Sequence, residues 1–580
     1  MRLSRTSGLP AALLALGLVT LAGTADDKKP ADKTDVEKVP FVGNWKVTVL
    51  FAPTLENTSF IVKIADKDGK PAMDTAWVAE QLKNIKVTVE DAKIDAKAVH
   101  FTLAIADNKW AMNAYPAKGA RDAKLLLGNA KAAAQPIPLV MEKTDDTEVP
   151  LKEMQKITPG AEDYQKAATE ADDKRKVAAL KEVLQKYEDK PIALPVAADL
   201  FREAAKHADK DDEVAAALKQ YLQVLNAYGP EMEEQANPKI ASALVRSDKA
   251  AALSLEYARK VEKSLDKDAP PVKQVPVLKL VARALRKNKK DAEAKALEDK
   301  AAKVDKELDE EFEKTAVPFE PEAFKGRKAA SHRVAVVELF TGAHCPPCVS
   351  ADIAFDAALK TFKPKDVLFL EYHLHIPRPD PLTNADTEAR EKFYGDEVRG
   401  TPTAFVNGKP TEPLGGLKQH GKDRYDTLRK AVEDALETDA PADIQVKAKR
   451  TGDKIEADVR VIDLKKPDDK LRLHVVLVED VVRYPGTNGQ RLHHHVVRAF
   501  FGGIEGTALK DETTQKKLTI DLAEVTKGLN AFLDESEKKR PFLDDERPMA
   551  LGNLKVIAFI QNDDSKEILQ AGQADVPDAK

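Results

Sequence analysis

Two cysteines separated by two prolines constrain this chain more than any other feature of its sequence. They are Cys345 and Cys348, and the 580-residue chain has no others. A disulfide between them closes a loop of four residues, which restrains an unfolded chain only slightly. Since the pair cannot join distant segments, we interpret both thiols as reserved for chemistry.

The residues on either side of the pair predict a strand, a tight turn and a helix. The run 334–340 is apolar at nearly every position, which is typical of a strand that is buried on both faces. A helix is expected from Val349 onward, and prolines are tolerated in its first turn because their missing N–H groups have no use there. Cys345 is therefore expected at a helix N-terminus, where free N–H donors and the helix dipole stabilise a thiolate.

Disulfide exchange requires a thiolate nucleophile and benefits from a second thiol that releases the product. Cys348 follows Cys345 by one helical turn and is within reach of a mixed disulfide at that residue. We predict that Cys345 is the attacking thiol and Cys348 the resolving thiol. The predicted enzyme is a thiol-disulfide oxidoreductase without a cofactor or a metal.

The segment that follows the cysteines predicts the element order β-α-β-α-β-β-α. Its parts are a strand at 367–372, a helix from Asn384 to about Tyr394, the run Val398-Arg399-Gly400-Thr401-Pro402-Thr403, a strand at 403–406, an Asn407-Gly408 hairpin and a helix at about 423–436. Residues 318–438 resemble the thioredoxin-like superfamily, particularly its exported TlpA-like and related secreted members. The resemblance covers about a fifth of the chain.

The resemblance implies roles for several residues. It implies that Thr401–Pro402 is a cis peptide facing the cysteines, and that the backbone around Thr401 pairs with an extended substrate. Glu338 matches the family's buried acid, which helps proton transfer to the resolving thiol, although the turn before Cys345 is one residue longer than usual. His344 replaces the usual Trp, and two roles stay open for it: a protonated stabiliser of the Cys345 thiolate, or a solvent-facing turn residue.

The N-terminus predicts export. Residues 1–25 combine Arg2 and Arg5 with an apolar run at 9–21 and small residues before Asp26. The apolar run is shorter than the roughly 20 residues that a membrane span needs. We predict a cleaved signal peptide, no stable membrane span in the mature protein, and a periplasmic, cell-envelope or secreted location.

Charge restricts the partners. The chain has 92 Lys and Arg against 97 Asp and Glu, and the two signs are interspersed. This balance argues against nucleic-acid binding and against a polybasic membrane patch. The expected partners are protein thiol or disulfide substrates and an electron donor or acceptor.

A chain of 580 residues is too long for one core, so we expect a multidomain fold. Short alternating runs predict a small antiparallel β domain at 40–145, and Ala-rich helical spacing predicts an α-helical domain at 155–315. The helices are either stacked pairs similar to tetratricopeptide-type repeats or a simple spacer. The thioredoxin-like α/β domain at 318–438 precedes an antiparallel β-sandwich at 441–577.

Two other functions are kept as alternatives, and the first is a copper- or zinc-handling protein. His373 and His375 lie at a strand end and, with the two cysteines, would make a zinc or copper site. We favour a polar strand end instead. His493-His494-His495 alternates between the two faces of a strand, so no compact set of three ligands is expected. The second alternative is an interaction protein of the cell envelope.

Overall fold

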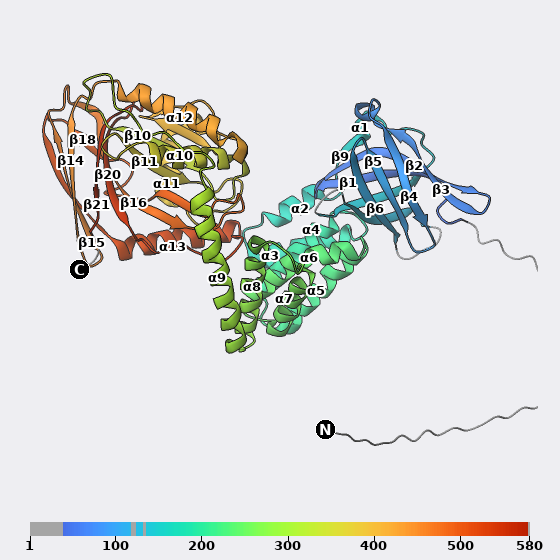
Figure 1. Cartoon of the computed structure of the whole chain (residues 1–580). Helices are drawn as coiled ribbons and strands as arrows, with labels where there is room; N and C mark the ends of the chain where they lie inside the picture. Colours follow the sequence, from blue (N-terminus) through green and yellow to red (C-terminus); the bar gives the residue numbers. More distant parts are fainter. Residues whose placement is uncertain (1–38, 118–122, 132–134, 578–580) are drawn as a thin grey trace, which may run out of the picture. The chain divides into compact units, whose positions relative to one another are not determined.

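The computed structural model describes residues 39–117, 123–131 and 135–577 (Figure 1). The predicted signal peptide at 1–25 lies outside these residues. The chain divides into two compact units, one with the residues up to Lys267 and Val277–Lys295, the other with Asp268–Pro276 and Ala296–Lys580. Helices and several β-sheets are both present, so the protein is a mixed α/β protein of more than one part. No helix within the described ranges has the length and apolar character needed to cross a bilayer.

An antiparallel sheet begins the first unit. Its strands run in the order β3-β2-β1-β8-β7-β6-β5-β4, and β9 pairs with β2. The bounds are β1 (Gly43–Ala52), β2 (Leu55–Lys67), β3 (Lys70–Val78), β4 (Val87–Ile94), β5 (Val99–Ile105), β6 (Asn108–Pro116), β7 (Leu125–Lys131), β8 (Ile137–Thr144) and β9 (Gln155–Ile157). Trp45 is fully buried in the core of this sheet, and its indole N–H donates to the Phe41 carbonyl (2.7 Å).

Helices follow the sheet. The bounds are α1 (Leu151–Met154), α2 (Ala161–Ala168), α3 (Asp173–Lys186), α4 (Ala193–His207), α5 (Asp211–Asn226), α6 (Pro230–Arg246), α7 (Ala251–Ser264), α8 (Pro271–Lys287) and α9 (Asp291–Thr315). The apolar faces of α2–α7 share one core with Leu50, Leu127 and Val140 of the sheet, and Val277 and Leu280 of α8 pack against it. The Asn129 side chain also donates to the Tyr228 carbonyl (3.0 Å). Because the sheet and most of these helices share a core, they form one compact unit rather than two.

A nine-stranded sheet organises the second unit (Figure 1). Its order is β13-β12-β10-β11-β17-β16-β20-β21, with β18 paired to β16. The bounds are β10 (Ala335–Thr341), β11 (Val367–His373), β12 (Thr403–Val406), β13 (Lys409–Pro410), β16 (Asp468–Arg483), β17 (Leu492–Phe500), β18 (Thr507–Leu509), β20 (Leu554–Asn562) and β21 (Ile568–Asp575). Strand β10 is parallel to β11, and β11 is parallel to β17 where Glu371 meets Val496.

Strand β10 is buried at every residue because both of its faces are covered. Val337 and Leu339 pack in the core that α10 (Val349–Thr361) and α12 (Gly421–Leu436) share. Val336 and Phe340 pack on the opposite face with residues of α11 (Ala385–Tyr394), β16, β17 and β20. The nearly continuous apolar run at 334–340 thus reflects two cores, one on each side of the sheet.

The C-terminal segment differs from the predicted separate β-sandwich at 441–577. Only β14 (Asp443–Thr451), β15 (Lys454–Ile462) and β19 (Thr514–Asp521) form a sheet of their own, whereas β16, β17, β20 and β21 extend the sheet that contains β10. Helix α13 (Leu522–Lys539) was not expected either. Alternation of apolar and polar residues identifies a strand that is covered on one face. It does not identify the neighbouring strand in the sheet when that strand lies 120 or more residues away in the chain.

His474 is a buried histidine in β16, and it makes stability depend on pH. Its ring stacks on Phe559 and meets Phe500 edge-on, and neither ring nitrogen has a hydrogen-bond partner among the described residues. Burial, together with the charges of Arg390 and Arg472, holds the pKa of His474 well below its ordinary value. The unfolded chain therefore binds one more proton than the folded chain in mild acid.

We expect His474→Leu to remove part of the acid sensitivity. In the native protein, His474 lowers the free energy of unfolding by about 1.4 kcal/mol for each pH unit below about 6.5, because its imidazole is protonated there only in the unfolded state. Urea unfolding of both proteins between pH 5 and pH 8 measures the difference. Parallel stability curves for the two proteins would contradict the expectation.

Candidate functional site

Cys345 and Cys348 form a disulfide at the junction of β10 and α10. The sulfur atoms are 2.03 Å apart, and residues Pro346–Cys348 form one 3₁₀ turn before α10 begins. Both cysteines are buried, at 1% and 0% exposure, whereas the two prolines between them are exposed. The disulfide is therefore present at the strand-to-helix turn, but its sulfur atoms are not open to solvent.

Thr401 contacts the disulfide from a loop 56 residues further along the chain. Its hydroxyl donates to Cys345 Sγ (3.3 Å), and its carbonyl oxygen lies 3.6 Å from the same sulfur. The Thr401–Pro402 peptide is cis. The hydroxyl would stabilise a thiolate at Cys345 because a charged acceptor strengthens the hydrogen bond.

His344 is buried rather than facing solvent, so the second of its two expected roles is wrong. Its Nδ1 lies 3.2 Å from the Thr487 hydroxyl, and its Nε2 lies 3.4 Å from the Tyr484 hydroxyl. Burial lowers the pKa of His344. A neutral imidazole supplies no positive charge to a Cys345 thiolate at neutral pH, which weakens the first role as well.

The loop 485–490, here named the cover loop, joins β16 to β17 and packs on the turn before Cys345. The Asn488 side chain donates to the Gly342 carbonyl (3.3 Å), and the Asn488 backbone N–H approaches the Ala343 carbonyl (3.4 Å). A Cβ on Gly486 would lie 2.0 Å from the Ala343 carbonyl oxygen, so only glycine fits this contact. The cover loop thus packs on the turn that leads into Cys345.

Replacing Gly486 with valine is expected to displace the cover loop and to expose the disulfide. We expect dithiothreitol to reduce the variant's disulfide several-fold faster than that of the native protein, because access of the reductant to sulfur limits exchange. Thiol titration over time measures this rate. Gly528→Ala is the control, since an added Cβ there meets nothing within 4 Å. Equal rates in folded Gly486→Val and native protein would show that the loop does not restrict access.

Glu338 lies in a buried ion pair. One carboxylate oxygen accepts from Arg390 Nε (2.8 Å), and the other accepts from the Tyr394 hydroxyl. Glu338 and Arg390 are both fully buried. Because both oxygens are engaged, this carboxylate is less suited to accept a proton from a thiol than the predicted role requires.

Asp352 is a buried acid that the sequence interpretation missed. It follows Cys348 by four residues on α10, the spacing that places two side chains on one helix face. Its carboxylate accepts from the Thr341 hydroxyl (2.7 Å). Burial, followed by the nearby charge of Glu371, raises the pKa of Asp352 well above its ordinary value. The i, i+4 spacing from a redox cysteine is the signal that would have identified it.

A buried cluster of histidines and carboxylates adjoins the disulfide turn. His373 Nε2 lies 3.0 Å from Glu371 Oε1, and His373 Nδ1 lies 2.9 Å from Asp380 Oδ2. Asp380 Oδ2 also accepts the backbone N–H of Ala343, two residues before Cys345 (2.6 Å). Burial alone would lower the pKa of His373, but Asp380 and Glu371 outweigh it and raise that pKa to about 10. The cluster therefore contacts the turn that holds the disulfide.

His493 of β17 completes this cluster. Its Nδ1 lies 3.6 Å from Glu371 Oε1, its Nε2 lies 3.0 Å from the Tyr484 carbonyl oxygen, and its ring meets that of His373 edge-on. The side chain is 3% exposed. Pairing of β11 with β17 brings His373 and His493 together across 120 residues of sequence.

The other histidines lie outside the set Glu371, His373 and His493. His375 contacts the Ser536 hydroxyl (3.1 Å), stacks on Phe532 and accepts the Asp380 backbone N–H at its Nδ1 (3.0 Å), so Asp380 contacts both His373 and His375. Strand β11 ends at His373, so strand alternation does not extend to His375. His494 and His495 contact Asp356 (2.8 Å) and Asp480 (3.2 Å) respectively. With both cysteines in a disulfide, a site built from them and His373 and His375 is not formed.

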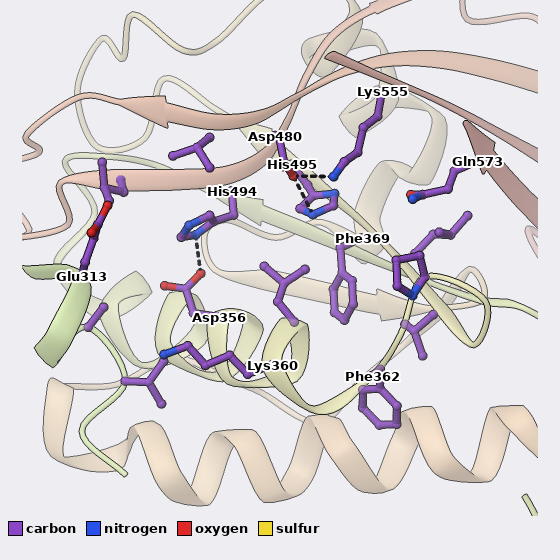
Figure 2. Close-up of a pocket in the computed structure, with 18 of the residues that line it drawn as sticks. Glu313, Asp356, Lys360, Phe362, Phe369, Asp480, His494, His495, Lys555 and Gln573 are labelled. Atoms are coloured by element: carbon purple, nitrogen blue, oxygen red, sulfur yellow. Dashed lines mark hydrogen bonds and ion pairs between the residues drawn. The ribbon is translucent and has the colours of Figure 1, made fainter. Parts of the chain in front are cut away.

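A pocket of about 460 Å³ lies beside α10 (Figure 2). Its apolar wall includes Phe362 and Phe369, and its polar end includes the His494–Asp356 and His495–Asp480 pairs. Neither cysteine lines it. The pocket is therefore not the opening through which a substrate reaches the disulfide.

Comparisons with known proteins identify no family. No protein-family model and no curated protein matches the chain. Among solved structures, HBP35 of Porphyromonas gingivalis is 18% identical, covers 44% of this chain and 78% of its own, and has a TM-score of 0.32. The Pseudomonas fluorescens alkylpurine DNA glycosylase AlkC, bound to DNA containing an abasic site analog, is 10% identical, covers 72% and 91%, and has a TM-score of 0.14. Both similarities are too low to support an argument about fold or function.

Proposed function

We propose that this chain is a thiol-disulfide oxidoreductase of the thioredoxin-like type, with Cys345 and Cys348 as its redox centre. One observation carries the proposal: a disulfide at a helix N-terminus is contacted at Cys345 Sγ by Thr401, the residue before a cis proline. The strand order β13-β12-β10-β11 supports it, as do α10 and α12 on one face of these strands and α11 on the other.

The proposed reaction moves two electrons from the dithiol to a substrate disulfide. The Cys345 thiolate attacks one substrate sulfur, which forms a mixed disulfide and releases the other substrate sulfur as a thiolate. Cys348 then attacks Cys345 Sγ, which re-forms the internal disulfide and releases the second substrate thiol. The proton of the Cys348 thiol passes to Asp352, the nearest acid along the same helix face.

Because both cysteines are buried, the proposed reaction requires a conformational change before the substrate can reach Cys345. Cys345 is 1% exposed, so residues around the disulfide have to move before a mixed disulfide forms with a protein substrate. The cover loop packs on the turn before Cys345 and is the segment that we propose to move. The backbone around Thr401 then pairs with the extended substrate, as the family resemblance implies. The cover loop thereby limits which disulfides react.

We place this activity outside the cytoplasm, in the periplasm or cell envelope or in the secreted fraction. Residues 1–25 have the pattern of a signal peptide, and disulfides persist in oxidising compartments. The antiparallel sheet and the helices of the first unit are proposed to position protein substrates or the electron donor or acceptor.

Insulin reduction by the full chain tests the proposed activity. With dithiothreitol as electron donor, we expect insulin precipitation well above the rate that dithiothreitol gives alone. Equilibration in redox buffers, followed by thiol alkylation, measures the reduction potential. A value near about −270 mV would indicate a reductase, and one near about −120 mV an oxidant. A disulfide that reduces normally but gives no turnover with any protein disulfide would overturn the proposal.

A further inference from the structure

We propose that Glu371, His373 and His493 bind one divalent transition-metal ion, at a site adjoining the disulfide but separate from it. These residues come from the neighbouring strands β11 and β17, and one ligand atom from each lies within 4.8 Å of the other two. All three are buried, at 3% exposure or less. This inference does not depend on the proposed oxidoreductase activity.

The spacing of the ligand atoms fits a single ion. Two atoms that each lie about 2.1 Å from an ion, at roughly 90–110° to each other, are separated by about 3.0–3.4 Å. Glu371 Oε1 lies 3.0 Å from His373 Nε2 and 3.6 Å from His493 Nδ1. These two separations lie at or within a few tenths of an ångström of that range, and the His373 and His493 ligand atoms lie within 4.8 Å of each other.

Each proposed ligand also makes a hydrogen-bond contact through its other polar atom, as metal ligands commonly do. His373 Nδ1 faces Asp380 Oδ2 (2.9 Å), and His493 Nε2 faces the Tyr484 carbonyl (3.0 Å). The second oxygen of Glu371 accepts the backbone N–H of His494 (3.0 Å). Metal-binding histidines characteristically donate their other ring N–H to a carboxylate or a backbone carbonyl, and these contacts orient the ligating atoms.

Charge balance is consistent with a divalent ion here. The carboxylates of Glu371 and Asp380 are both buried, and each lies within 3.0 Å of a His373 ring nitrogen. A divalent cation held by Glu371 would offset these two buried negative charges, which are costly to leave uncompensated.

The ligand set indicates the class of metal. Two imidazole nitrogens and one carboxylate oxygen suit zinc or iron(II), whereas copper(I) prefers sulfur ligands. Zinc is the appropriate probe because it has no redox chemistry and cannot itself reduce the disulfide. Through Asp380, which accepts the Ala343 N–H, the ion would stiffen the turn before Cys345.

Zinc content of the full-length protein tests the site. The chain is produced in zinc-supplemented medium and dialysed, and zinc is measured by mass spectrometry. We expect one zinc ion per chain in the native protein and a loss to background in His493→Ala and Glu371→Gln. His207→Ala disrupts the exposed Asp173–Glu203–His207 group, another set of candidate ligands, and is expected to keep its zinc.

A double variant, Cys345→Ser with Cys348→Ser, separates this site from one built on the thiols, and it too is expected to keep its zinc. No zinc on the native protein overturns the proposal, whether or not any variant folds. Zinc that persists in folded His493→Ala, or that is lost in His207→Ala or in the double cysteine variant, also overturns it.

Thermal unfolding gives an independent readout: added zinc should raise the unfolding midpoint of the native protein and leave that of Glu371→Gln unchanged. Insulin turnover is scored separately, so failure of the metal site and failure of the proposed function are distinguishable.

Discussion

Cys345→Ser is expected to abolish insulin reduction by the full chain, leaving only the rate of dithiothreitol alone. Serine is nearly isosteric with cysteine, but its hydroxyl is not ionised near neutral pH and does not attack a disulfide. Cys348→Ser is expected to behave differently, since Cys345 can still attack once. That variant should accumulate a mixed disulfide with its substrate, visible as a reducible adduct on a non-reducing gel.

The two variants together assign the roles of the cysteines. Thr401 contacts Cys345 Sγ, and Cys345 precedes the 3₁₀ turn that leads into α10, so attack from Cys345 is the expected order. Trapping by Cys345→Ser rather than by Cys348→Ser would reverse the assignment. Undiminished turnover in Cys345→Ser would remove the proposed redox centre altogether.

Arg390→Met is expected to lower the free energy of unfolding of the second unit by about 3–5 kcal/mol. Arg390 and Glu338 are both fully buried, and Arg390 Nε donates to Glu338 at 2.8 Å. Methionine fills much of the space but leaves the carboxylate charged and unpaired in an apolar core. Urea unfolding followed by circular dichroism measures the loss.

The double variant Arg390→Met with Glu338→Leu is the control for this prediction. Removing both charges eliminates the unpaired carboxylate, so much of the lost stability should return. If the double variant loses as much free energy of unfolding as the two single variants lose together, packing of the Arg390 side chain, rather than pairing of charges, explains the loss. The guanidinium also lies over the Phe393 and Phe559 rings, which makes this control necessary.

Local sequence patterns predicted much of the region around the disulfide. An apolar run ending in a tight turn predicted β10, and the spacing of the cysteines placed them at the start of α10. The later strands and helices up to α12 occur in the predicted order. These features depend on residues that are close in sequence, so periodicity and turn chemistry are enough to find them.

The residues that complete the site could not be found in this way. His493 reaches His373 only because β17 pairs with β11, and the cover loop reaches the Gly342–His344 turn for the same reason. The predicted sandwich boundary separated these strands. Burial of His344 and the engagement of Glu338 by Arg390 also depend on contacts between segments far apart in the chain.

By itself, the sequence determined that the chain has one cysteine pair, that this pair lies at a strand-to-helix turn, and that a Thr-Pro segment follows it by about 50 residues. Only the tertiary structure decided that the disulfide is buried, and that the turn before it contacts both a loop from the C-terminal segment and a histidine–carboxylate cluster. The physical reason is that the pattern of apolar and polar residues in a strand indicates which of its faces are covered. It does not record which distant strand lies beside it, and that neighbour places the remaining functional groups.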